Sequence, residues 1–110
     1  MQNQRIEKLL EFLKQTPQDS FVLYALATEY VSTGDDETAL KYYETLLSLD
    51  PTYVATYYHL GKLMKRLGKE DRASKLFKEG MVQAKIKKDQ HSLSELQTAL
   101  TNLELGLEDD

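Results

Sequence analysis

The sequence repeats itself in size and character, though rarely in identity, at a spacing of 34 residues. The first copy carries, at matching positions, Leu23, Leu26, Ala27, Tyr30, Gly34, Ala39, Tyr43 and Pro51, and the second carries Tyr57, Leu60, Gly61, Met64, Gly68, Ala73, Phe77 and Lys85. A period of this length is typical of stacked helix–turn–helix units, because each unit buries its apolar face only against its neighbours. Such arrays present an extended surface, so the period favours binding over catalysis.

Apolar residues at helical spacing predict six helices and no strands. The expected ranges are 5–15, 21–32, 37–49, 54–67, 70–87 and 92–107. The last range has a narrow apolar seam made of Leu93, Leu96, Leu100, Leu103 and Leu107.

Several helix boundaries have local signals. Gly34 suits the left-handed residue that follows a helix, and Pro17 ends the first helix because the residue before a proline avoids the helical region. Pro51 is predicted to lie in the first turn of the helix that follows it. Ser92 with Glu95 predicts a capping box in front of the last helix.

These elements predict an all-α fold, a short α-solenoid of antiparallel helix pairs with a C-terminal capping helix. A chain of 110 residues suffices for one domain. Within it we expect an N-terminal half repeat at 5–18, a first repeat at 20–53, a second repeat at 54–87 and the capping helix at 92–107.

Charge is distributed along the chain in three blocks. Residues 1–61 hold four basic and nine acidic side chains, residues 62–88 hold ten and three, and residues 89–110 hold six acidic and no basic ones. The formal net charge of −4 argues against nucleic acid as the main ligand. The basic block would attract an acidic partner, or the acidic C-terminal segment of the chain itself.

The sequence lacks the residues of common catalytic and metal sites. It has no cysteine, and its two histidines, His59 and His91, have no carboxylate at a convincing spacing. Phosphate-loop and nucleophile motifs are also missing. We therefore expect no enzymatic activity, no cofactor and no metal. No apolar run could span a bilayer and residues 1–5 do not begin a signal peptide, so we expect no membrane contact and a cytoplasmic location.

The recurring residues resemble the tetratricopeptide repeat (TPR) family. Its pattern has a large residue, Leu-Gly and Tyr in the first helix, then Ala, Phe and Ala in the second, with Pro at the boundary. The two repeats here fill it with Leu23, Leu26-Ala27, Tyr30, Ala39, Tyr43, Leu46 and Pro51, and with Tyr57, Leu60-Gly61, Met64, Ala73, Phe77 and Gly80. Leu46 replaces the second small residue of the pattern, and Lys85 replaces the proline.

The resemblance implies a concave groove, lined by the first helix of each repeat, that holds an extended peptide or a partner's helix. The candidate groove residues are Phe21, Tyr24, Thr28 and Val31 in the first repeat and Ala55, Tyr58, Lys62 and Lys65 in the second. Aromatic side chains supply contact area, and lysines steer acidic ligands. The alternative is that Phe21 packs on the half repeat and that the two lysines form a solvated face.

One subtype of the family, the chaperone adaptors, clamps a carboxylate with Lys and Asn on successive groove helices. Tyr24, Thr28 and His59 stand at those positions here, and no third groove helix is expected. The clamp is therefore absent.

The resemblance thus implies a non-enzymatic protein-interaction module or adaptor that binds a peptide or helix of a partner protein in its groove. The alternative is a self-associating structural module, a homo-oligomer formed through the repeat ends or the C-terminal leucine seam. The dependence of the mass in solution on concentration distinguishes the two.

Overall fold

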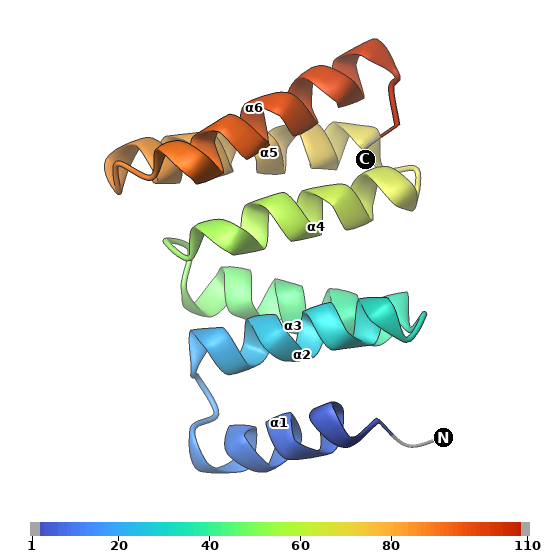
Figure 1. Cartoon of the computed structure of the whole chain (residues 1–110), viewed down its shortest axis with the longest axis vertical. Helices are drawn as coiled ribbons and strands as arrows, with labels where there is room; N and C mark the ends of the chain where they lie inside the picture. The colour runs from blue at the N-terminus through green and yellow to red at the C-terminus, as the bar shows by residue number, and fades with distance from the viewer. Residues whose placement is uncertain (1–2, 109–110) are drawn as a thin grey trace. The chain divides into compact units, whose positions relative to one another are not determined.

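The computed structural model describes residues 3–108, which form six helices and no strand (Figure 1). The helices divide into two compact units, the first ending at Pro51 and the second beginning at Thr52. Each unit contains three helices, in agreement with the helix number that the sequence predicts.

The first unit consists of α1 (Gln4–Gln15), α2 (Ser20–Ser32) and α3 (Asp36–Leu49). Its central helix, α2, packs against both α1 and α3. The most buried side chains of the unit lie on α2 and α3 and are Leu26, Ala27, Ala39, Tyr43 and Leu46. The small residue Ala39 is fully buried, as expected for a position at which two helices approach closely.

Helix α1 is attached to α2 through a contact that remains partly exposed. Glu29 on α2 pairs with Arg5 Nε at 2.9 Å and accepts a hydrogen bond from Asn3 Nδ2 at 3.3 Å. No residue of α1 is buried, and the side chain of Phe12 is 58% exposed. The apolar side of this helix is therefore only partly covered, and Phe12 is its most exposed apolar residue.

The second unit consists of α4 (Val54–Arg66), α5 (Glu70–Ile86) and α6 (Gln90–Leu105). Helix α5 packs against α4 and α6, and α6 also touches α4. The α6 seam supplies Leu96, Ala99 and Leu103 to the core, while Leu93 and Leu100 are half-buried. The leucine seam is thus used within the chain, against α4 and α5.

Two predicted boundaries are wrong. Asp89, rather than Ser92, caps α6: its Oδ1 accepts from the Ser92 backbone N–H at 3.0 Å and its Oδ2 from the Ser92 hydroxyl at 2.7 Å. A carboxylate one turn earlier offers an ionised acceptor to the positive end of the helix. Pro51 lies in the turn before α4, which begins only at Val54.

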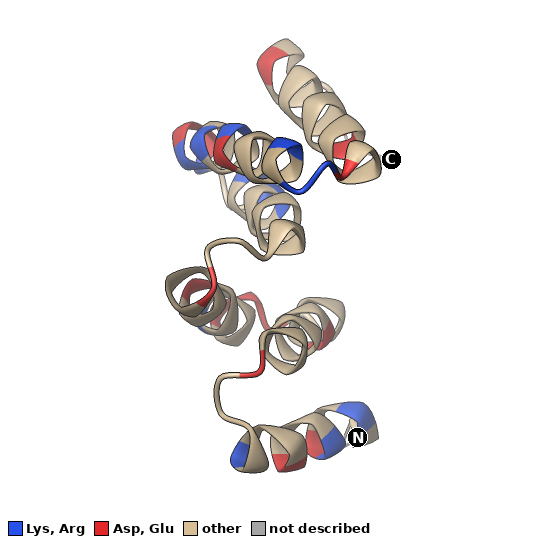
Figure 2. Ribbon diagram, turned by 90° about the vertical axis from the view of Figure 1, so that its left-hand side faces the viewer, with Lys and Arg blue, Asp and Glu red and all other residues tan. Residues whose placement is uncertain are grey.

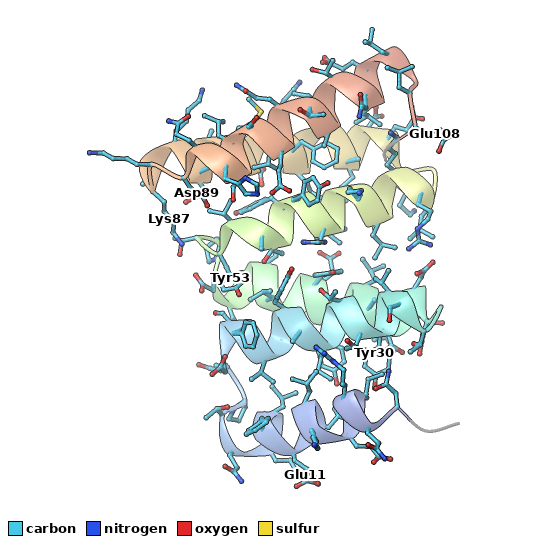
Figure 3. All side chains as sticks on the ribbon, viewed as in Figure 1. Glu11, Tyr30, Tyr53, Lys87, Asp89 and Glu108 are labelled. Carbon is cyan, nitrogen blue, oxygen red and sulfur yellow. The ribbon has the colours of Figure 1, made fainter. Side chains whose placement is uncertain are left out.

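Four of the six described helices, α2, α4, α5 and α6, are followed by a residue in the left-handed conformation. Gly34, Gly68 and Gly106 follow their helices with φ of 85°, 81° and 69°. Lys88 takes the same place after α5 with φ of 58°, in the turn that Figure 3 marks with Lys87 and Asp89. Leu107, which the sequence places in the seam, lies beyond Gly106 and is 51% exposed.

Candidate partner-binding site

The candidate groove residues of the first repeat all lie on α2. Phe21 is 62% exposed, and its ring centroid is 6.5 Å from that of Tyr24. The Thr28 hydroxyl is hydrogen-bonded to the Tyr43 hydroxyl at 3.2 Å. Burial raises the pKa of Tyr43, and the Thr28 bond opposes that rise. Thr28 therefore supports the core, while Phe21 and Tyr24, with the half-buried Val31, offer apolar surface.

The candidate groove residues of the second repeat all lie on α4 and are half-buried. Lys62 Nζ lies 5.1 Å from the centroid of the Tyr58 ring and donates a hydrogen bond to the Tyr58 hydroxyl at 3.4 Å. A cation over a tyrosine face is attracted by the ring quadrupole. The positive charge of Lys62 is therefore held close to Tyr58.

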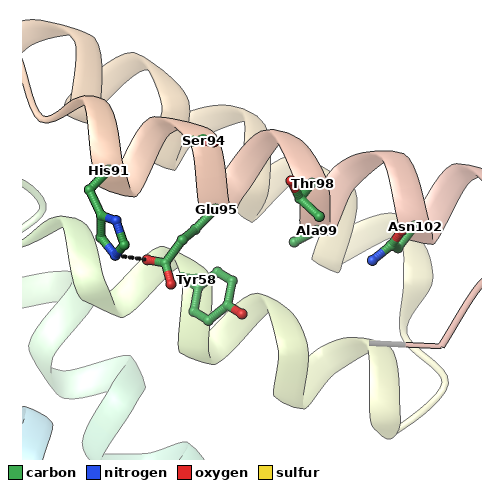
Figure 4. Close-up of a pocket in the computed structure, with 7 residues that line it drawn as sticks. All are labelled: Tyr58, His91, Ser94, Glu95, Thr98, Ala99 and Asn102. Atoms are coloured by element: carbon green, nitrogen blue, oxygen red, sulfur yellow. Dashed lines mark ion pairs between the residues drawn. The ribbon is translucent and has the colours of Figure 1, made fainter. Parts of the chain in front are cut away.

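Tyr58 also lines an open pocket of about 280 Å³ between α4 and α6 (Figure 4). The other lining residues all come from α6 and are His91, Ser94, Glu95, Thr98, Ala99 and Asn102. The expectation that no third helix joins this surface is wrong, because α6 packs beside α4 as well as on α5.

The ionisable groups around the pocket are mixed in sign. His91 Nε2 lies 3.6 Å from Glu95 Oε1, so the expectation that neither histidine has a carboxylate partner is wrong for His91 (Figure 4). Burial lowers the pKa of His59, the Lys62 ammonium lowers it further, and the Glu95 carboxylate opposes both effects. His59 is therefore neutral at neutral pH, and Lys62 and Glu95 place charges of opposite sign near the pocket.

Sequence reasoning missed the α6 side of this pocket. The leucine seam identified only the buried side of the helix. On another side, polar residues recur at steps of three and four, namely His91, Glu95, Thr98 and Asn102. A polar stripe at helical spacing beside a candidate groove helix was the available signal.

The far end of α6 returns to α4. Lys65 Nζ donates a hydrogen bond to the Leu107 carbonyl at 2.6 Å. The chain thus folds back to the last turn of α4 as far as Leu107, next to the acidic Glu108. Asp109 and Asp110, which in one of the two alternatives fold back toward the basic helices, lie outside the described residues.

Residues 3–108 contain no group of three or more histidine, aspartate or glutamate side chains arranged to hold a metal ion. Over the same range no helix has the length and apolar character needed to cross a membrane. The side chains that line the pocket offer hydroxyls, an amide, a carboxylate, an imidazole and the Tyr58 ring, on which the Lys62 ammonium lies.

Comparisons with known proteins identify the family that shares this architecture. A family model described as TPR repeat matches residues 27–68. A tetratricopeptide repeat domain protein from Salinibacter ruber is 43% identical, over 78% of this chain and 97% of that one, with a TM-score of 0.76. A protein from Bordetella parapertussis is 27% identical, over 96% and 91% of the two chains, with a TM-score of 0.81.

Among curated proteins, the photosystem I assembly protein Ycf3 of Acaryochloris marina is 34% identical over 59 residues, which are 53% of this chain. The match covers 36% of that protein, and a match to Ycf3 of Rippkaea orientalis covers 42%, so the chain spans about two fifths of these relatives.

The chain belongs to the TPR family. The predicted all-α helical-repeat fold and the family resemblance are both confirmed. TPR domains are a non-catalytic fold that mediates protein–protein interaction, so the general class of function predicted from the sequence is confirmed as well.

Proposed function

We propose that this protein is a cytoplasmic adaptor that binds a peptide or helix of a partner protein on the first helices of its repeats, with α6 contributing beside α4. The observation that carries the proposal is the open pocket between α4 and α6, with Tyr58 on one side and polar α6 side chains on the other. On α2, the exposed Phe21 and its neighbour Tyr24 offer a second contact surface.

The chemistry of the pocket suits a peptide. An extended peptide needs partners for its backbone amides and carbonyls, and the hydroxyls of Ser94 and Thr98 with the amide of Asn102 supply both donors and acceptors. The Tyr58 ring supplies apolar area, and Lys62 on its face favours an acidic side chain. The curated relatives are named for the assembly of a protein complex, which supports a role that acts on other proteins.

The proposal is tested by affinity capture from a native lysate, with bound proteins identified by mass spectrometry and their affinities then measured in purified form. The variants are Tyr58→Ala with Lys62→Glu for the pocket and Tyr24→Ala for α2. Lys41→Glu on the exposed side of α3 is the matched control. A purified partner should lose at least about tenfold in affinity with the pocket variant. A partner held equally well by wild type, pocket variant and α2 variant contradicts the proposed surface.

The second candidate function is self-association, favoured by the exposed Phe12 on a helix that buries none of its residues. Light scattering across a range of concentrations would then give a rising mass that Phe12→Ser reduces. A monomer at all concentrations excludes this candidate and leaves the adaptor function.

A further inference from the structure

Helix α5 presents a stripe of basic and apolar side chains to solvent, here called the α5 face. It consists of Lys75, Lys78, Val82, Lys85 and Ile86, all of them exposed. Their spacing of three and four residues puts them on one side of the helix. Val82 and Ile86, one turn apart, are 55% and 69% exposed. None of the five lines the pocket between α4 and α6.

The repeat itself provides an internal comparison for this face. Shifted back by one repeat, the α5 face falls on Lys41, Glu44, Ser48, Pro51 and Thr52. The two exposed apolar residues thus replace Ser48 and Thr52, and Lys78 replaces Glu44. At Ser48 the first repeat forms its second helix without an exposed apolar residue, so the fold does not require one at Val82; Thr52 lies in the turn beyond the end of α3.

The charge around the two apolar residues is mostly positive. Residues 75–88 include five lysines and a single acidic residue, Glu79. Figure 2 shows blue Lys and Arg segments on α5, among some red ones, and on the turn that follows it, whereas α6 carries red segments and no blue. A face with an apolar centre and a basic border complements a segment with an apolar stripe between acidic residues.

We infer that the α5 face docks an acidic amphipathic helix of a partner protein, at a site separate from the pocket of the proposed function. Two apolar residues of the partner, one turn apart, would pack against Val82 and Ile86. Its flanking carboxylates would face Lys78 and Lys85. Binding at the α5 face thus requires charge and apolar contact together, and each of the two is removed separately in the test.

Glu108, the acidic residue that follows Leu107, does not fit as the occupant. The Leu107 carbonyl accepts from Lys65 in the last turn of α4, so this end of the chain lies near the start of α5. Figure 3 marks Glu108 and Asp89 at opposite ends of α6. Helix α5 is about 25 Å long, and Val82 and Ile86 lie toward its other end. Glu108, directly after Leu107, is therefore held away from Ile86.

A membrane surface fits less well than a protein helix. Interfacial helices insert large apolar or aromatic side chains along their whole length. The α5 face has two branched aliphatic residues near one end of the helix and Glu79 close to them. A partner helix can place an uncharged residue against Glu79, whereas an anionic bilayer cannot avoid it.

The test uses a labelled synthetic peptide of about four helical turns, with leucines one turn apart and glutamates on the flanking positions. Binding to the full chain is measured by fluorescence anisotropy. Val82→Ser with Ile86→Thr installs the residue types of the first repeat and should weaken binding about tenfold. Lys78→Glu with Lys85→Glu should weaken it at least as much at low salt. Circular dichroism checks that the helices are unchanged.

Four controls make the outcome decisive. Lys41→Glu on α3 and Tyr58→Ala in the pocket should leave peptide affinity unchanged, and a fall with Tyr58→Ala would overturn a separate site. The proposed function is contradicted by a different result, namely a purified partner whose affinity does not change when Tyr58 is substituted. If a peptide with serines in place of the leucines binds with the same affinity as the leucine peptide, binding depends on charge alone. That result would overturn the inference. Binding to phosphatidylcholine–phosphatidylserine vesicles without binding to the peptide would overturn it in favour of a membrane.

Discussion

Gly61 and Phe77 are in contact so closely that no side chain fits between them. A Cβ added to Gly61 would lie 2.7 Å from Phe77 Cδ1 and closer still to Cε1. The Phe77 ring is fully buried and has no room to move away. The glycine in α4 thus sets how closely α4 and α5 approach.

We predict that Gly61→Ala lowers the free energy of unfolding by about 1–3 kcal/mol through overpacking, as measured by urea denaturation. Combining it with Phe77→Leu, which makes room for the methyl group, should cost less than the sum of the two single changes. Strict additivity in this double-mutant cycle would show that the ring does not press on Gly61.

Lys88 adopts a left-handed conformation that its side chain disfavours. Lys88→Gly should raise the free energy of unfolding by about 0.5–1 kcal/mol, since the strain removed outweighs the added freedom of the unfolded chain. Gly34→Ala should lower it by a similar amount, because Gly34 has the same conformation. Lys87→Gly is the matched control: Lys87 has φ of −83°, so this change should bring no stabilisation.

Leu96 is fully buried in the α6 seam, whereas Leu105 at the end of the same helix is 66% exposed. Leu96→Ala should cost about 2–5 kcal/mol in chemical denaturation, because it removes transfer free energy and leaves a cavity. Leu105→Ala should cost well under about 1 kcal/mol. Equal effects would mean that the seam of α6 is not packed against α4 and α5.

Thr56 is fully buried, and its hydroxyl has no hydrogen-bond partner among the described residues. Thr56→Val keeps the shape and removes the buried polar group, so it should raise the free energy of unfolding by about 1 kcal/mol. Thr56→Ser keeps the hydroxyl and removes a methyl group, so it should lower stability. A destabilised valine variant would reveal a partner for the hydroxyl.

Asp89 gives α6 a predictable response to acid. The Ser92 backbone N–H, then the Ser92 hydroxyl, lower the pKa of Asp89 from its ordinary value of 3.8, with smaller contributions from His91 and Lys87. A pKa lowered by folding contributes stability that is complete above the ordinary value and is lost as pH falls through the folded one. The protection factor of the Ser92 amide against hydrogen exchange, followed by NMR, should therefore fall as the pH drops below 3.8.

The matched variant is Asp89→Asn, which keeps a capping oxygen and cannot titrate. It should remove this acid step in Ser92 exchange while leaving α6 formed at neutral pH. An acid step of the same size in the asparagine variant would assign the effect to another carboxylate.

Periodicity and turn residues were sufficient to predict the number, order and approximate bounds of the helices. They rest on local rules: apolar spacing, the left-handed glycine after a helix and the restriction before proline. Boundaries failed where two local signals competed, as at Asp89 and Ser92, because the choice between caps depends on which side chain reaches the free amide.

By itself, the sequence determined the helical-repeat fold, the family and the small residues Ala39, Ala73 and Gly61 that the packing needs, since these follow from spacing and size. Only the tertiary structure decided that α6 lies against α4 and joins Tyr58 in a pocket, and that Val82 and Ile86 stay exposed. The physical reason is that helical spacing specifies which residues share a face. What that face meets depends on side chains brought together from distant parts of the chain.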